Sequence, residues 1–312
     1  MATGRQIVMT GLLSIPLWLA AAFLLYWPSD ADPKSIPHPI GWSGSKDETK
    51  DPSTSNFWKH VDLKSQEIPE TVTKRSASIK VKESVLSVDN VQVFYREAQS
   101  EGESSAHISI LLLHGAAFSS ETWLHLGTIQ ILAAMGYRTV AIDVPGYGKS
   151  SLADISDHGE FLNHVIKALD LKRPVVVSPS MSGTYALPYL LKHSEEMGGY
   201  IPVAPVGTGI LERQSCASSQ TEEDQLASVC ESLRKFLKPP LPNLSCIKTP
   251  TLVVFGEYDR GKHSALLCLL PRSQAAEIPE GRHPAYLDNP KLWHKLLYNF
   301  LGHAAQLAAK SQ

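Results

Sequence analysis

A hexapeptide at positions 178–183, Ser-Pro-Ser-Met-Ser-Gly, restricts the fold of this chain more than any other segment. It follows the Val-rich stretch Pro174–Val177, which has the pattern of a buried strand, and it precedes Gly183–His193, which has the pattern of a helix. A serine in such a strand–turn–helix unit occupies a strained turn that lifts its hydroxyl clear of the sheet edge. The context therefore predicts Ser180 as an exposed nucleophile.

The flanking positions of this turn favour Ser180 over its neighbour. Residues two places before and after the nucleophile must be small, because the strand and the helix pack closely there. Both positions are serine for Ser180. Ser182 is the alternative nucleophile, with Ser180 and Thr184 at these positions. Thr184 is bulkier and would lie inside the predicted helix, so we favour Ser180.

Predicted strands and helices alternate through the rest of the chain. Val85–Val88 and Val91–Tyr95 flank Asp89–Asn90 and predict a β-hairpin, and Ile108–Leu113 is continuously apolar, as expected of a parallel strand covered on both faces. The later elements are strands at Arg138–Val144, Pro174–Val177, Tyr200–Ala204, Thr251–Phe255 and Ala275–Ile278, and helices at Glu121–Met135, Glu160–Leu169, Gly183–His193, Ser264–Leu270 and Lys291–Leu307. This order predicts one α/β domain at 76–312, with a mostly parallel, doubly wound sheet and helices on both faces. With the serine turn, this is the α/β-hydrolase fold.

A serine hydroxyl needs a positioned base, and in this fold an acid and a histidine follow the serine in the chain. Asp259 and His283 both come after late predicted strands. Glu257 is the alternative acid, but it lies nearer its strand and should reach less far. His193 and His263 lie in or beside predicted helices, which makes them weaker candidates. We therefore expect Ser180, Asp259 and His283 to form a catalytic triad.

Hydrolysis through a serine also needs two backbone N–H donors for the oxyanion. One is expected from Met181, directly after the nucleophile. The other is expected from the loop after the first parallel strand, His-Gly-Ala-Ala at 114–117, with Ala116 as the donor.

Other classes of site find little support in the sequence. Gly148-Lys149-Ser150 imitates the end of a phosphate-binding loop, but its required earlier glycine is Asp143. A partial dinucleotide motif at Gly207 has Glu212 in place of its last glycine. The spacing of the His, Cys and carboxylate residues does not resemble that of a metal site. The net charge is −2, and the sequence has no cluster of basic residues of the kind that binds nucleic acid. We therefore expect no cofactor, no metal and no nucleic-acid partner.

The N-terminal region predicts attachment to a membrane. Residues Ile7–Trp27 form a mostly apolar, uncharged run, which as a helix would be about 31 Å long and would cross a bilayer core of about 30 Å. Arg5 precedes the run and Asp30 and Asp32 follow it, which favours a cytoplasmic N-terminus. We expect an uncleaved anchor at 1–27, a flexible stalk at 28–75, and a type II protein with a lumenal or extracellular catalytic domain. A cleaved signal peptide and a cytoplasmic protein are the alternatives.

A segment at 211–245 interrupts the alternation of strands and helices. Its length and its own predicted helix suit a lid over the site, and a surface loop is the alternative.

Asn243 begins a glycosylation sequon, Asn-Leu-Ser. The four cysteines of the chain allow one or two disulfides or buried free thiols, and they are Cys216, Cys230, Cys246 and Cys268.

Several motifs together resemble the alpha/beta hydrolase domain-containing 14 family. They are Leu-Leu-Leu-His-Gly at 111–115, Phe-Ser-Ser-Glu-Thr-Trp at 118–123, Asp-Val-Pro-Gly-Tyr-Gly at 143–148, the serine hexapeptide at 178–183 and His-Pro-Ala-Tyr-Leu-Asp at 283–288. The resemblance covers about Ser76 to Leu307, and the predicted anchor and stalk look like the membrane-bound A type of the family. It implies the same triad of Ser180, Asp259 and His283.

These features predict a serine hydrolase that acts on an ester, thioester or amide through an acyl-enzyme at Ser180. An acyltransferase that passes the acyl group to a thiol or another acceptor has the same sequence requirements. A non-catalytic, membrane-tethered binding module is the alternative from another class, because fold alone does not imply activity. The complete set of expected triad residues favours the enzyme.

Overall fold

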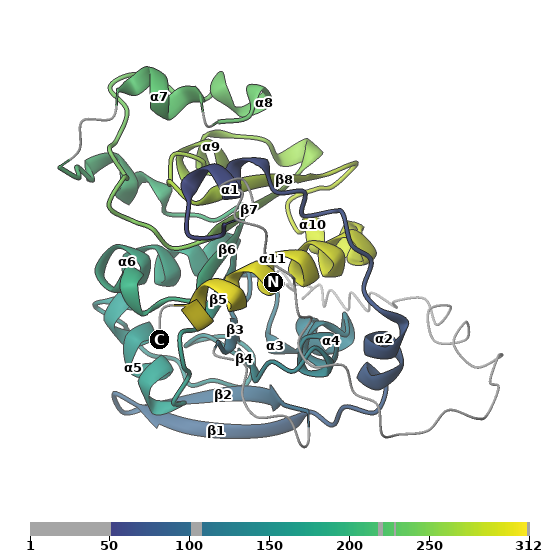
Figure 1. Ribbon diagram of the computed structural model, residues 1–312. Coiled ribbons are helices and arrows are strands. Elements are labelled where there is room, and N and C mark those ends of the chain that lie inside the picture. The colour runs from purple at the N-terminus through teal and green to yellow at the C-terminus, as the bar shows by residue number, and fades with distance from the viewer. Residues whose placement is uncertain (1–50, 101–107, 218–220, 228, 311–312) are drawn as a thin grey trace, which may run out of the picture. The chain divides into compact units, whose positions relative to one another are not determined.

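The computed structural model describes residues 51–100, 108–217, 221–227 and 229–310. In this part of the chain, eight strands form one sheet in the order β1-β2-β4-β3-β5-β6-β7-β8 (Figure 1). The first two strands form an antiparallel hairpin that pairs antiparallel with β4, and all later pairings are parallel. The strands are β1 (Lys82–Val88), β2 (Val91–Ala98), β3 (Ile110–Leu112), β4 (Thr139–Ile142), β5 (Val175–Pro179), β6 (Gly199–Val203), β7 (Thr251–Gly256) and β8 (Ser273–Ile278). The predicted α/β fold class is confirmed.

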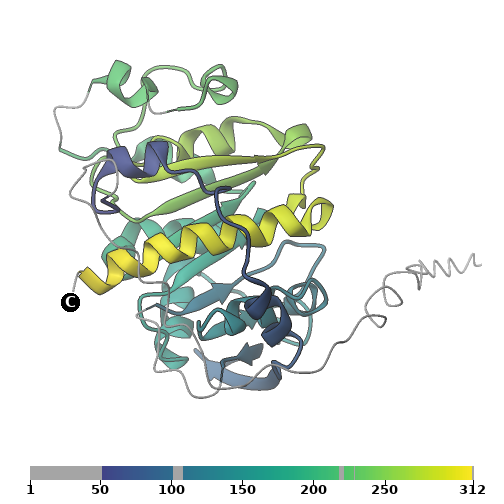
Figure 2. The same ribbon diagram turned by 45° about the vertical axis from the view of Figure 1, so that its right-hand side comes forward.

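The two faces of the sheet have separate apolar cores because side chains alternate along each strand. Leu111 and Val176 point into one core, and Leu112 and Val177 point into the other. The first core is covered by α5 (His158–Ala168), α6 (Gly183–His193) and α9 (Lys262–Leu267). The second is covered by α3 (Ser120–His125), α4 (Thr128–Ala134), the short α10 (Ala285–Asp288) and the long α11 (Pro290–Lys310), which crosses in front of the sheet in Figure 2. This gives the three layers of a doubly wound fold.

One predicted helix is two helices in the structure. The sequence predicts a single helix at Glu121–Met135, but α3 ends at His125 and α4 begins at Thr128. Gly127 lies between them with φ +76°, a left-handed conformation that glycine adopts without steric cost. Ser119 caps α3, because its hydroxyl accepts the N–H of Glu121.

The structure also differs from the expected stalk in residues 51–75. This stretch contains α1 (Ser55–His60) and most of α2 (Glu70–Ser76). Phe57 and Trp58 of α1 are buried, and the Trp58 ring lies 5.4 Å from the ring of Phe300 in α11. Two aromatic side chains thus anchor a polar segment, because each can bury a large apolar area. Residues 28–50 of the expected stalk lie outside the described part of the chain.

The segment between β6 and β7 packs beside α9 and is closed by a disulfide. It contains η5 (Thr208–Arg213), α7 (Glu222–Ala227) and α8 (Glu231–Arg234), and α8 contacts α9. The bond joins Cys216 to Cys246 and thereby ties the two ends of this insertion together. Cys230 and Cys268 are free thiols, the first exposed and the second buried. The structure thus combines two of the expectations, one disulfide and one buried thiol.

Within the described ranges, no helix has both the length and the hydropathy needed to cross a membrane. The predicted anchor at 1–27 lies outside those ranges.

Candidate active site

Ser180 occupies a sharp turn between β5 and α6. The strand ends at Pro179, the 3₁₀ turn η3 covers Ser180–Ser182, and the helix begins at Gly183. Ser180 has φ +48°, a left-handed conformation that costs a non-glycine residue about 1–3 kcal/mol. The surroundings hold this turn, because the backbone N–H of Val206 donates to the Ser180 carbonyl at 2.8 Å. The strained turn expected from the sequence is therefore present.

The small residues around Ser180 are needed for close packing. Ser178 and Ser182 are completely buried, and a Cβ on Gly183 would lie 2.3 Å from the Val206 carbonyl oxygen. The Ser182 hydroxyl donates to the Pro179 carbonyl at 2.8 Å. The Ser182 hydroxyl thus stabilises the turn, whereas the Ser180 hydroxyl contacts a histidine.

Three residues from different loops meet at the carboxyl edge of the sheet. Ser180 Oγ lies 2.8 Å from His283 Nε2, and His283 Nδ1 lies 2.6 Å from Asp259 Oδ2. The carboxylate accepts the Nδ1–H, which leaves Nε2 free to accept the serine proton. The His283 side chain is 49% exposed, so the site is open to solvent. The three side chains are thus in contact in the order that a nucleophile, a base and an orienting acid would require.

The loops that carry Asp259 and His283 are packed directly on each other. Asp259 ends the 3₁₀ turn η6 (Glu257–Asp259) after β7, and His283 follows β8. A Cβ on Gly256 would lie 2.3 Å from the Gly281 carbonyl oxygen, so only glycine permits this approach. The N–H of Tyr258 donates to the same carbonyl at 2.9 Å. Backbone contacts thus fix the separation between the acid and the histidine.

Glu257, the alternative acid, has other partners. Its Oε2 accepts the backbone N–H of Glu280 at 2.9 Å, and its Oε1 lies 3.8 Å from the Arg260 guanidinium. It supports the loop before His283 and makes no contact with the imidazole among the hydrogen bonds of the described residues.

Asp288 is a site-supporting residue to which the sequence assigned no role. Its carboxylate accepts the backbone N–H of Arg282 at 2.7 Å and forms an ion pair with the Arg282 guanidinium. This ion pair and hydrogen bond lower the pKa of Asp288. Asp288 thereby holds the residue directly before His283. The sequence feature that could have indicated this role is the position of Asp288 at the end of the His-Pro-Ala-Tyr-Leu-Asp motif.

The expected oxyanion donors lie on the two segments beside Ser180. Met181 follows Ser180 in η3. Ala116 is exposed in the turn after β3, and a Cβ on the preceding Gly115 would lie 3.5 Å from Ser180 Cβ. Both segments therefore border Ser180, and the donor roles of Ala116 and Met181 remain predictions.

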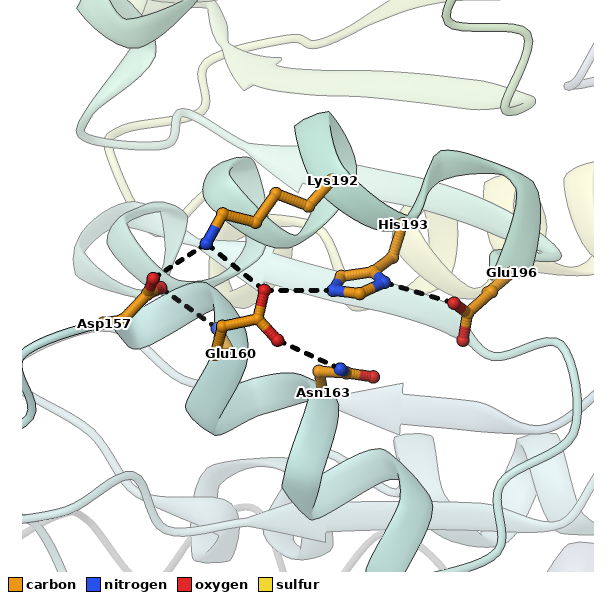
Figure 3. Close-up of polar contacts among 6 residues, drawn as sticks. All are labelled: Asp157, Glu160, Asn163, Lys192, His193 and Glu196. Atoms are coloured by element: carbon orange, nitrogen blue, oxygen red, sulfur yellow. Dashed lines mark hydrogen bonds and ion pairs between the residues drawn. The ribbon is translucent and has the colours of Figure 1, made fainter.

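A network of charged side chains holds α6 against α5 (Figure 3). Lys192 donates to Asp157 at 2.7 Å and to Glu160 at 3.2 Å, and His193 lies 3.3 Å from the same Glu160 carboxylate. Asp157 also caps α5 by accepting the N–H of Glu160. The network holds the C-terminal end of α6, the helix that follows the Ser180 turn. His193 contacts Glu160 in this network and is not part of the Ser180 site.

The other candidate positions have partners outside the Ser180–His283–Asp259 set. His263 contacts Thr208 Oγ1 at 2.7 Å, between α9 and η5. Asn243 lies at the base of the insertion, where its Nδ2 donates to the Cys216 carbonyl at 2.7 Å. Glycosylation at Asn243 and a lid role for 211–245 remain predictions. Among the described residues, no group of three or more His, Cys, Asp or Glu side chains could hold a metal ion.

Comparisons with known proteins agree with the α/β fold. The family model described as "alpha/beta hydrolase fold" matches residues 108–282. A relative from Pongo abelii, "Putative protein-lysine deacylase ABHD14B", is 38% identical over 234 residues, which cover 72% of this chain and 98% of that protein. Protein ABHD14A from Danio rerio is 35% identical over 222 residues, which cover 67% of this chain and 71% of that protein. The crystal structure of a CIB-like hydrolase from Thermoplasma acidophilum gives a TM-score of 0.55 at 22% identity, covering 72% of this chain and 99% of that one.

The sheet, the serine turn and the family match define an α/β-hydrolase. Within that superfamily, the chain belongs to the ABHD14 family, as its motifs indicated. The relatives include proteins named for both the A and the B type, so assignment to the membrane-bound A type stays a prediction.

Proposed function

We propose that this protein is a serine hydrolase that cleaves an acyl compound through an acyl-enzyme at Ser180. The observation that carries the proposal is the continuous contact from Ser180 Oγ through the His283 imidazole to the Asp259 carboxylate, at 2.8 and 2.6 Å. A serine hydroxyl becomes a good nucleophile only with a positioned base, and the base works best when a third group orients it.

In the first step, His283 Nε2 takes the proton of Ser180 while Oγ attacks the carbonyl carbon of the substrate. Asp259 holds the Nδ1–H and stabilises the imidazolium that forms. The N–H groups of Ala116 and Met181 stabilise the oxyanion. The imidazolium then gives its proton to the leaving group, and the acyl group stays on Ser180.

In the second step, His283 Nε2 takes a proton from a water molecule while the water oxygen attacks the acyl carbon of the acyl-enzyme. The bond between that carbon and Ser180 Oγ then breaks, the imidazolium returns its proton to Oγ, and the acid is released. The substrate class is an ester, thioester or amide. The relative named as a protein-lysine deacylase supports an acyl amide as one such substrate. Covalent labelling of the full chain with a fluorophosphonate probe tests the proposal, because the probe reacts with an activated serine.

We infer further that the catalytic domain faces an oxidising compartment as part of a type II membrane protein. Disulfides persist mainly in such compartments, so the Cys216–Cys246 bond supports this location. The apolar run Ile7–Trp27 and the charges around it supply the expected anchor and orientation. Protease treatment of intact microsomes tests it: a domain digested without detergent would place the enzyme in the cytosol.

A further inference from the structure

His114 is a buried histidine that connects two loops beside the nucleophile. It directly follows the apolar stretch that contains β3, and its side chain is only 1% exposed. Its Nδ1 lies 2.9 Å from the carbonyl oxygen of Gly115, and its Nε2 accepts the backbone N–H of Val144 at 3.0 Å. Neither contact belongs to the Ser180–His283–Asp259 set.

These two contacts determine where the His114 proton lies. The Val144 N–H is a donor, so Nε2 must offer a lone pair, and the proton of a neutral ring then lies on Nδ1. That Nδ1–H donates to the Gly115 carbonyl. Burial lowers the pKa of His114, against opposing effects of the Gly115 carbonyl and the Asp143 carboxylate, which favours the neutral ring.

The Gly115 carbonyl controls the direction of the Ala116 N–H. Both belong to one planar trans peptide, in which the C=O and the N–H point in opposite directions. The backbone N–H of Phe118 donates to the same carbonyl at 3.0 Å, so two donors hold this oxygen. A Cβ on Gly115 would lie 3.5 Å from Ser180 Cβ, which places the peptide beside the nucleophile.

We propose that His114 is a positioning residue, which orients the Gly115–Ala116 peptide so that the Ala116 N–H serves as an oxyanion donor. This inference rests on the proposed serine-hydrolase function. Removing an oxyanion donor lowers kcat by about 10²–10³-fold in other enzymes. Loosening a donor that is still present should lower kcat less, by about 10- to 100-fold.

Two substitutions separate the contacts of His114. Asn places its amide near the position of Nδ1, so His114→Asn can still donate to Gly115 but leaves the buried Val144 N–H unpaired. Gln reaches the position of Nε2, so His114→Gln can accept from Val144 but loses the donor to Gly115. In His114→Gln the Gly115 carbonyl still accepts the N–H of Phe118, so both the Gly115 carbonyl and the Val144 N–H keep a hydrogen-bond partner.

The experiment measures kcat and KM for p-nitrophenyl acetate, together with the thermal midpoint, on the full chain in detergent. The positioning role predicts that His114→Gln keeps nearly the wild-type midpoint and KM but loses about 10- to 100-fold in kcat. It also predicts that His114→Asn is less stable than His114→Gln and yet more active per folded molecule, as counted by fluorophosphonate labelling.

The outcomes distinguish the inference from the function on which it rests. If kcat follows the thermal midpoint, so that His114→Asn is the less active variant, His114 is merely structural and the inference is overturned. If His114→Gln turns over like the wild type, the inference also fails while the proposed function stands. If the wild type shows no turnover that Ser180→Ala removes, the proposed function fails and the inference with it.

Discussion

His283 Nε2 lies 2.8 Å from Ser180 Oγ, although 103 positions separate the two residues in the chain. Ser180 follows β5 and His283 follows β8, three strands apart in the sheet. Parallel strands bring their carboxyl ends to one edge, and Asp259 reaches the same edge after the intervening β7. The site is therefore a product of the strand order.

The serine assignment is tested by two substitutions in one turn. Ser180→Ala should abolish fluorophosphonate labelling because it removes the attacking oxygen. Ser182→Ala should keep most of the labelling but lower stability by about 1 kcal/mol, since it removes a buried hydrogen bond to Pro179. Gel fluorescence and thermal unfolding give the two readouts. Full labelling of Ser180→Ala would end the assignment.

The acid assignment is tested at Asp259 and Glu257. Asp259→Asn should leave the fold intact and reduce kcat by about 10⁴-fold, as the equivalent change does in a serine protease, because the imidazole adopts the wrong tautomer. Glu257→Gln is the matched control, since the Glu257 carboxylate accepts the N–H of Glu280 and, among the described residues, makes no hydrogen bond with His283. Steady-state kinetics on an ester decides between them. A harmless Asp259→Asn with a damaging Glu257→Gln would reverse the assignment.

Two buried histidines should make the fold sensitive to acid. Burial lowers the pKa of His294 and of His303 to about 4, whereas an unfolded chain has a histidine pKa of about 6.5. As the pH falls, these histidines are therefore protonated in the unfolded chain before they are protonated in the folded chain. Their contribution to stability is complete above about pH 6.5 and is lost as the pH falls towards 4. At pH 5, each of the two histidines should lower the free energy of unfolding by up to about 2 kcal/mol relative to neutral pH.

Urea unfolding at pH 7.5 and pH 5 measures this dependence. His294→Gln removes one titrating group and can still reach Thr128 Oγ1, which contacts His294 Nε2 at 2.9 Å. It should reduce the loss of stability between the two pH values by up to about 2 kcal/mol. His125→Gln is the control, because the His125 side chain is 73% exposed. An unchanged pH dependence in His294→Gln would contradict the assignment to buried histidines.

The disulfide should stabilise the insertion between β6 and β7. Cys216 and Cys246 are 30 positions apart, and closing a loop of this length restricts the unfolded chain by about 3–4 kcal/mol in the entropy model. Cys246→Ser should therefore lower the free energy of unfolding by up to that amount, measured with urea. Cys230→Ser should have little effect, since this exposed thiol lies outside the bond. Equal stability of wild type and Cys246→Ser would show that the bond contributes nothing.

The sequence determined the local units of this fold. The strand–turn–helix around Ser180 was predictable because strand periodicity, helix periodicity and small flanking residues are properties of neighbouring positions. The helix Gly183–His193 has the same bounds in the structure as in the prediction. The prediction of a single helix at 121–135 was wrong because Gly127 adopts a left-handed conformation there. The periodicity of apolar residues does not show such a conformation.

Tertiary structure decided the features that depend on distant contacts. Burial of Phe57 and Trp58 against α11 ordered a segment whose average composition is polar, and average composition does not show where two aromatic rings will find a partner. The pairing of Cys216 with Cys246 is one of several that the spacing allowed. The contact of Asp259 with His283, and the turning of Glu257 towards Glu280, follow from the packing of Gly256 against Gly281. A sequence specifies which residue types are present and in what order. Packing fixes the ångström-scale distances between loops, and the proposed chemistry at Ser180 depends on those distances.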